Sequence, residues 1–135
     1  MNKIQRAYAL AKASHDAIKE ANDQREAEFC RARGYVTAEG NPALHVWMID
    51  DETIFETANA EFCAMNEQGS NDEIKARELL RAAEDALIEW GISIMPASMH
   101  KEAETLRNGA KNLMRVREKL IDIAFRLDSR TIRTA

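Results

Sequence analysis

Two stretches of the chain, one near each end, repeat apolar residues with a period of seven. Steps of four and three from Met99 trace a mostly apolar stripe, and the same steps from Ile4 trace a second one. Residues at this spacing share one face of an α-helix. Because each apolar face needs a partner of the same period, the pattern predicts a long antiparallel helix pair, at about 3–33 and 99–128.

Local signals mark both ends of the first helix. Asn2 is a favourable N-cap, and Gln5 can return its hydrogen bond in a capping box. Gly34 readily takes the left-handed conformation that ends a helix. These signals predict that the first long helix begins directly after Asn2 and ends at Gly34.

Two shorter helices are predicted in the middle of the chain. An apolar face at helical spacing indicates a helix at about 51–67, which would stop at Gly69. A capping-box sequence that starts at Ser70 then predicts a helix at about 71–90, which would end at Gly91.

The segment 35–49 has two interpretations, which stay open at the level of sequence. A turn that ends at Pro42 separates two apolar runs, so the segment is compatible with a short β-hairpin. Pro42 is also a favourable first residue of a helix. The strand preferences of Val46, Trp47 and Ile49 favour the hairpin.

Composition agrees with a mainly α protein. Hydrophobic residues make up 45% of the 135 residues, whereas glycine, proline and aromatic residues are too few for a sandwich or barrel. The length fits one helical domain, 1–135. No apolar run is long enough to cross a bilayer, so we expect a cytoplasmic protein without membrane contact.

The C-terminal apolar residues exceed what one helix face requires. Between 113 and 127 they cover more than the stripe that a single partner helix would bury. The excess predicts a homodimer through 113–127, unless the same residues form the core beneath the two shorter helices.

Charge is strongly segregated along the chain. The net charge is -4, but residues 39–89 hold 13 acidic and 3 basic residues, and residues 101–135 hold 9 basic and 5 acidic ones. A surface of one sign attracts partners of the opposite sign. The proposed partner-binding residues of the acidic middle, called the acidic surface below, are Asp50, Asp51, Glu52, Glu56 and Glu61.

Basic residues near the C-terminus provide an alternative. They could contact the phosphates of a nucleic acid, although no exposed aromatic residue or known motif accompanies them. Cations in the last turn of a helix also stabilise it by themselves. The candidate nucleic-acid-binding residues are Arg115, Arg117, Lys119, Arg126, Arg130 and Arg133.

Catalytic and metal-binding motifs are missing from the sequence. It contains no HExxH, GxGxxG, P-loop or nucleophile-elbow motif, and no Glu-x-x-His or Glu-x-x-Glu pair of the kind that bundle metal sites use. Carboxylates from Asp16 to Glu26, near His15, are interpreted as a solvated helix face. Cys30 and Cys63 are interpreted as reduced thiols, because their positions suggest neither a disulfide framework nor a zinc site.

These observations favour a protein that works by binding. We expect a non-enzymatic interaction module, an adaptor or inhibitor without cofactor or metal, whose acidic surface docks on a protein partner with a basic surface. A phage-type inhibitor of a nucleic-acid-handling enzyme would have this character, since a dense acidic surface can imitate a phosphate backbone. A helical nucleic-acid-binding protein that uses the basic C-terminal residues is the alternative.

Overall fold

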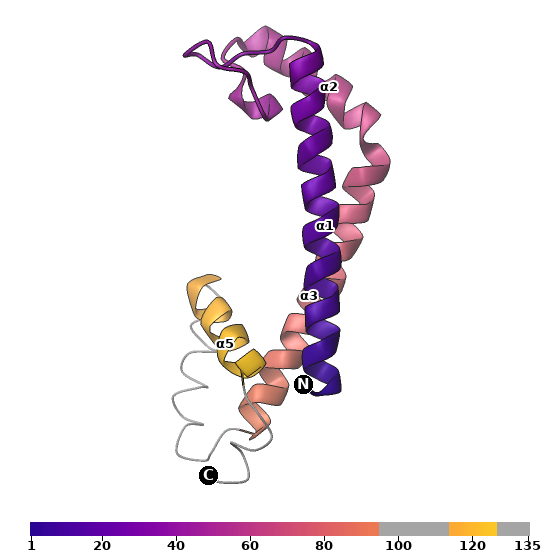
Figure 1. The fold of residues 1–135 in the computed structure, drawn as a ribbon, viewed down its shortest axis with the longest axis vertical. Coiled ribbons are helices and arrows are strands. Elements are labelled where there is room, and N and C mark those ends of the chain that lie inside the picture. Colours follow the sequence, from indigo (N-terminus) through magenta and orange to yellow (C-terminus); the bar gives the residue numbers. More distant parts are fainter. Residues whose placement is uncertain (95–113, 127–135) are drawn as a thin grey trace. The chain divides into compact units, whose positions relative to one another are not determined.

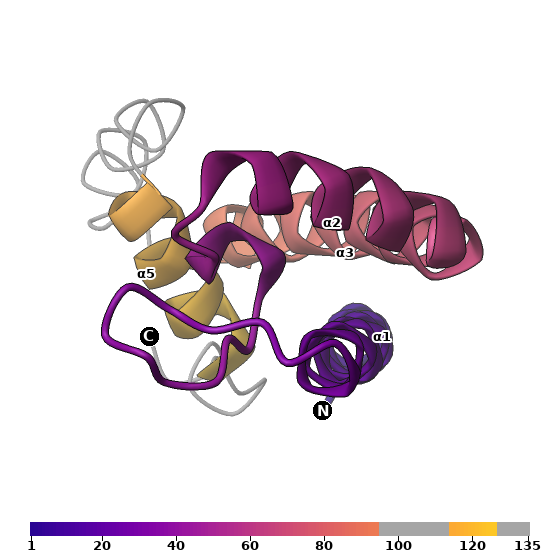
Figure 2. The ribbon, with the colours of Figure 1, turned by 90° about the horizontal axis from the view of Figure 1, so that it is seen from above.

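The structure, a computed structural model, describes residues 1–94 and 114–126. Within these residues the chain forms α-helices and one short 3-10 helix, and no β-strand (Figure 1; Figure 2 shows the same ribbon from above). The prediction of a mainly α protein is confirmed. The helices are α1 (Lys3–Ala32), the 3-10 helix η1 (Val46–Met48), α2 (Glu52–Met65), α3 (Glu67–Ile94) and α5 (Met114–Arg126).

The predicted helices differ most from the observed ones in the second half of the chain. The helices expected at 3–33 and 51–67 correspond closely to α1 and α2, but α3 begins earlier and ends later than the expected 71–90. A long helix pair exists, and the long helix that packs along α1 is α3. Of the helix expected at 99–128, residues 114–126 are helical, whereas 99–113 and 127–128 lie outside the described residues.

Residue contacts group the protein into two compact units. Unit 1 consists of Met1–Lys12 and the described part of Glu78–Ala135, and unit 2 consists of Ala13–Arg77. Because α1 and α3 each contribute to both units, the two cores are described separately below. None of the described helices combines the length and the apolar character that a membrane crossing requires.

The two ends of α1 are capped as the sequence predicts. The Asn2 amide donates to Gln5 Oε1 over 2.9 Å, and the Gln5 amide donates to Asn2 Oδ1 over 2.8 Å, which completes the capping box. At the other end Gly34 has a φ of 67°, and the Tyr35 amide donates to the carbonyl of Cys30. This is the Schellman arrangement, which satisfies the last carbonyls of the helix.

Gln5 also connects the start of α1 to the end of α5 within unit 1. Its Nε2 donates to the carbonyls of Ala124 and Phe125 over 3.2 and 3.1 Å, and the residue is buried. These carbonyls lie in the last described turn of α5. One glutamine therefore caps the start of α1 and also holds α5 against it.

Replacement of Gln5 tests this double role. We expect Gln5→Ala to lower the free energy of unfolding by about 1 to 2 kcal/mol, because it removes half of a capping box and both hydrogen bonds from Gln5 to α5. Urea denaturation followed by circular dichroism measures the loss. Lys3→Ala, at an exposed position in the same turn, is the control and should change stability little. Equal stability of the two variants would mean that Gln5 stabilises neither helix.

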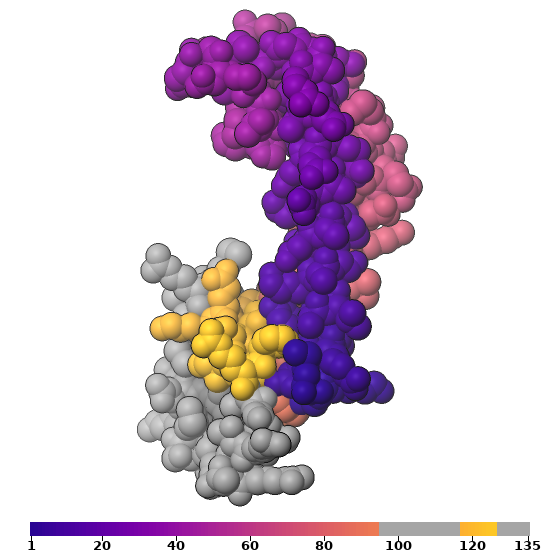
Figure 3. All heavy atoms as spheres, in the orientation of Figure 1, coloured from indigo at the N-terminus to yellow at the C-terminus, as the bar shows by residue number. Residues whose placement is uncertain are grey.

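The core of unit 1 forms where α3 and α5 meet. Leu120, Ile121 and Ala124 of α5 are buried against Leu87 and Ile88 of α3. Part of the apolar excess expected at 113–127 is thus covered within the chain itself, and the homodimer remains a prediction. Partly buried residues around this core are Ile4, Tyr8, Trp90, Ile92 and Phe125, and Figure 3 shows α5 against the start of α1.

The core of unit 2 joins the end of α1 to α2 and to the segment between them. Phe29 of α1 contacts Phe62 of α2, with ring centroids 5.3 Å apart, and Tyr35 lies beside Phe29. Arg33 lies over the Phe29 ring at 4.3 Å. The buried residues of this core are Phe29, Cys30, Ala43, Val46, Ile49, Ala58 and Phe62.

The segment 35–49 is neither the expected hairpin nor the alternative helix. A tight turn does form, with Gly40 at a φ of 82° and one antiparallel bridge between Val36 and Pro42. The second expected strand is replaced by η1, because Val46 and Ile49 both enter the core. A spacing of three residues suits one helical turn, whereas a strand would direct these two side chains to opposite faces.

The junction between α2 and α3 is a single residue, Asn66, and not the expected break at Gly69. The Asn66 side chain is buried, accepts a hydrogen bond from Arg25 Nε at 2.9 Å and donates one to Asn22 Oδ1 at 3.3 Å. Asn22 in turn donates to the carbonyl of Gly69 and to Glu73, each over 3.0 Å. This polar network fastens α1 to the bend between α2 and α3.

Gly69 lies inside α3, and the side chains of this network occupy the space that its own side chain would need. A Cβ at this position would lie 2.5 Å from Arg25 Nη2 and from Asn66 Oδ1. The glycine thus allows close approach of two helices and does not end one. The capping-box sequence that begins at Ser70 consequently lies within α3 instead of starting a helix.

Candidate functional site

All five residues of the acidic surface lie in unit 2, on α2 or directly before it. Each of them is exposed, as a partner-binding surface requires. Two of them also have contacts within the protein. Asp51 is the N-cap of α2 and accepts from the Ile54 amide over 3.0 Å, and Glu61 forms an ion pair with Arg33.

Three residues of the acidic surface remain available to a partner. Asp50, Glu52 and Glu56 form no ion pair with any other residue in the described parts of the chain. Glu52 and Glu56 are four residues apart on α2, so they share one side of the helix. The acidic surface thus has its uncompensated charge at the beginning of α2.

An exposed tryptophan lies beside this charge. Trp47 of η1 has 70% of its surface exposed, while Val46 and Ile49 on either side of it are buried. Only three residues separate it from Asp51, so the Cα atoms of the two residues lie at most about 14 Å apart. In Figure 3 the segment that carries it projects from the end of α1. Because η1 also contacts α2, the exposed indole and these carboxylates lie in the same region of unit 2.

Two basic residues of α5, Arg117 and Arg126, are engaged within the chain. Arg117 is partly buried, and its Nη2 lies 2.8 Å from Asp85 Oδ1 while its Nε lies 3.7 Å from Glu84 Oε2. Arg126 pairs with Asp122 on the same helix. Because Arg117 is compensated by two carboxylates of α3, it cannot also provide a free charge for phosphate.

The rest of the alternative set is less constrained by the structure. Lys119 is exposed on α5. Arg115 belongs to α5, but its side chain is not described, and Arg130 and Arg133 lie outside the described residues. The structure thus brings no basic cluster together among the described side chains of this set.

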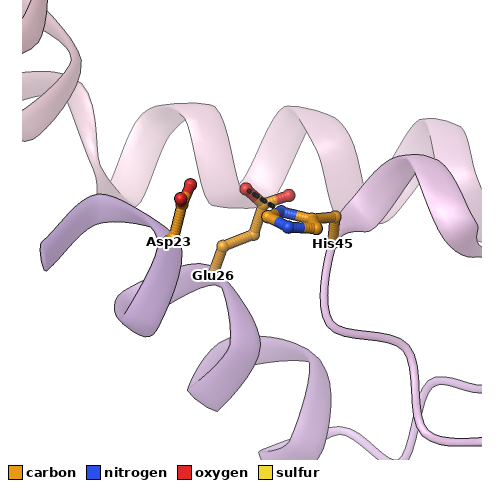
Figure 4. A group of neighbouring side chains, drawn as sticks. All are labelled: Asp23, Glu26 and His45. Atoms are coloured by element: carbon orange, nitrogen blue, oxygen red, sulfur yellow. Dashed lines mark hydrogen bonds and ion pairs between the residues drawn. The ribbon is translucent and has the colours of Figure 1, made fainter. Parts of the chain in front are cut away.

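Three potential metal ligands meet in unit 2, where the sequence suggested none. Asp23 and Glu26 lie one turn apart on α1, and His45 comes from the segment before η1 (Figure 4). One ligand atom from each lies within 4.8 Å of the other two. The adjacent carboxylates were visible in the sequence, but only the path of 35–49 places His45 beside them.

Hydrogen bonds hold two of these side chains in place. Glu26 Oε1 lies 3.3 Å from His45 Nδ1, and Glu26 Oε2 accepts from the Val46 amide over 2.7 Å. The His45 ring is stacked on Trp47, with centroids 6.0 Å apart and planes 10° from parallel. Asp23 is paired with Lys19 over 3.1 Å.

The other reactive side chains lie elsewhere. His15, expected on the seam of α1, is 3.4 Å from Asp16 through Nδ1. Cys63 is exposed on α2, whereas Cys30 is fully buried, and both are free thiols. Burial, and secondarily the negative charge of Glu26, raises the pKa of the Cys30 thiol, so this cysteine is a core residue and a poor nucleophile.

Comparisons with known proteins found no match among protein families, curated proteins or solved structures.

Proposed function

We propose that this protein is a non-enzymatic interaction module that docks on a protein partner with a basic surface. The supporting observation is the exposure of Trp47 next to Asp50, Glu52 and Glu56. Tryptophan is strongly enriched among the residues that dominate binding energy at protein interfaces. In this proposal the indole is the anchor and the carboxylates are the charged rim.

The chemistry of the exposed residues defines the partner. An indole gains most when it enters an apolar recess that excludes water. Carboxylates around it favour lysine and arginine on the rim of that recess, which accelerates association and rejects acidic surfaces. The proposed partner therefore presents an apolar recess surrounded by basic residues. An adaptor and an inhibitor, such as a phage-type inhibitor of a nucleic-acid-handling enzyme, would both use this arrangement.

Two variants test the proposal. Trp47→Ala and the triple variant Asp50→Lys, Glu52→Lys and Glu56→Lys should keep the melting temperature, because the replaced side chains are exposed. The partner is first identified by crosslinking and mass spectrometry and then purified. Both variants should bind this purified protein at least about tenfold more weakly than the original chain does. Leu10→Ala, at an equally exposed leucine of unit 1, is the control and should bind normally.

The same variants separate the two candidate functions. If the triple variant and Trp47→Ala bind the partner as well as the original chain does, the acidic surface has no such role. Titration of labelled DNA and RNA at two salt concentrations then tests the alternative, since contacts to phosphate weaken steeply with salt. Charge reversal at Lys119, Arg130 and Arg133 would abolish that binding if the alternative holds.

A further inference from the structure

A second capability is suggested by the residues of Figure 4 and does not depend on the proposed function. Asp23 and Glu26 of α1 and His45 of the following segment contribute two carboxylates and one imidazole to one place. Imidazole and carboxylate are the nitrogen and oxygen ligands that Zn²⁺ uses in sites with an open position. We propose that these three residues bind Zn²⁺ or a similar divalent first-row ion.

The spacing of Glu26 and His45 fits this assignment. Zinc bonds to nitrogen and oxygen are about 2.0 to 2.2 Å long, so two ligand atoms of a tetrahedral site lie roughly 3.4 Å apart. Glu26 Oε1 and His45 Nδ1 are separated by 3.3 Å. An ion between the α1 carboxylates and the imidazole thus needs little movement of these two groups.

The second carboxylate requires a small adjustment. Asp23 lies one turn before Glu26 on α1, so both side chains leave the helix on the same side. Its pair with Lys19 joins two well-exposed side chains, and such pairs contribute little free energy. A divalent ion replaces this weak partner with a stronger one.

The surroundings of the site restrain the ligands. The Val46 amide fixes the second oxygen of Glu26, as the outer partners of ligating carboxylates do. The neighbouring residues Ala43 and Val46 are buried in the core of unit 2, which anchors the backbone on both sides of His45. The side chains of His45 and Glu26 are 29% and 19% exposed, respectively, so the ion retains access to water. The bound ion joins the segment that carries Trp47 to α1.

Calorimetric titration of the full chain with ZnCl₂ in a non-coordinating buffer tests the proposal. We expect one ion per chain and a rise in melting temperature with zinc, because the ion binds only the folded arrangement. His45→Ala and Asp23→Asn should each weaken zinc binding at least about tenfold. His15→Gln is the matched control, since it removes a histidine of the same unit that also lies beside a carboxylate, and it should bind zinc normally.

A fluorescence measurement locates the ion. Because Trp47 stacks on His45, paramagnetic Co²⁺ at this site should quench its emission, and Trp47→Phe should remove the quenching while retaining the calorimetric signal. Absence of zinc binding at millimolar concentration overturns the proposal. Binding that survives Asp23→Asn and His45→Ala overturns it equally, and if His45→Ala fails to fold, Asp23→Asn decides alone.

Discussion

Leu120→Asp is expected to unfold unit 1. Leu120 is only 2% exposed and lies among Leu87, Ile88, Ile121 and Ala124. The substitution removes an apolar side chain and places a carboxylate among the apolar side chains of this core, a combination that costs about 4 kcal/mol. Much of the stability of a domain of this size would be lost. Circular dichroism during thermal and urea denaturation measures the effect.

Ile123→Asp is the matched control for this prediction. Ile123 lies on the same helix but is 36% exposed, so the same charge should cost less than about 1 kcal/mol there. If the predicted homodimer uses α5, this control should reduce the mass in light scattering without unfolding the chain. A Leu120→Asp protein as stable as the Ile123→Asp protein would show that α5 does not pack on α3.

Gly69→Leu is expected to separate α3 from α1 in unit 2. The new side chain would overlap with Asn22, Arg25 and Asn66, whose hydrogen bonds fill the space beside Gly69. Leucine has the higher helix propensity by somewhat less than 1 kcal/mol, but overpacking and the broken buried hydrogen bonds together cost about 3 kcal/mol. The net effect is therefore a lower free energy of unfolding, which chemical denaturation should measure.

Ser70→Leu distinguishes crowding from a general effect of leucine in this turn. Ser70 is exposed and directly follows Gly69 in α3, so leucine there should leave stability within about 0.5 kcal/mol of the original. Comparable losses in both variants would contradict the role of the polar network. A Gly69→Leu protein more stable than the original would mean that propensity outweighs the overlap.

Helix ends were predictable where the signal is local. Asn2 and Gln5 bond to each other, and Gly34 takes its conformation without long-range help, so the limits of α1 follow from adjacent residues. The limit between α2 and α3 was misplaced, because Gly69 and Ser70 have the composition of a helix boundary. What decides this position is the approach of α1, which adjacent residues do not encode.

The candidate sites likewise contain features that adjacent residues predict and features that depend on long-range contacts. Exposure of Glu52 and Glu56 follows from the helical period of α2, so the exposure of these two carboxylates was predictable. The exposure of Trp47 was not, because a strand and a single helical turn direct the indole differently. The meeting of His45 with Glu26 depends on the whole path of 35–49 and could not be derived from spacing.

The bonds from Gln5 to the carbonyls of Ala124 and Phe125 constrain the order in which the protein folds as it is synthesised. Gln5 is 119 and 120 positions from these two residues in the sequence. The start of α1 can therefore form these hydrogen bonds only after α5 has left the ribosome. Unit 2 is one contiguous stretch, Ala13–Arg77, and all of its contacts are available much sooner. Because segments that emerge from the ribosome fold from the N-terminal side as their contacts become available, we expect unit 2 to form before unit 1. The apolar side of the first turns of α1, around Tyr8, should then stay exposed to chaperones and proteases until α5 is available.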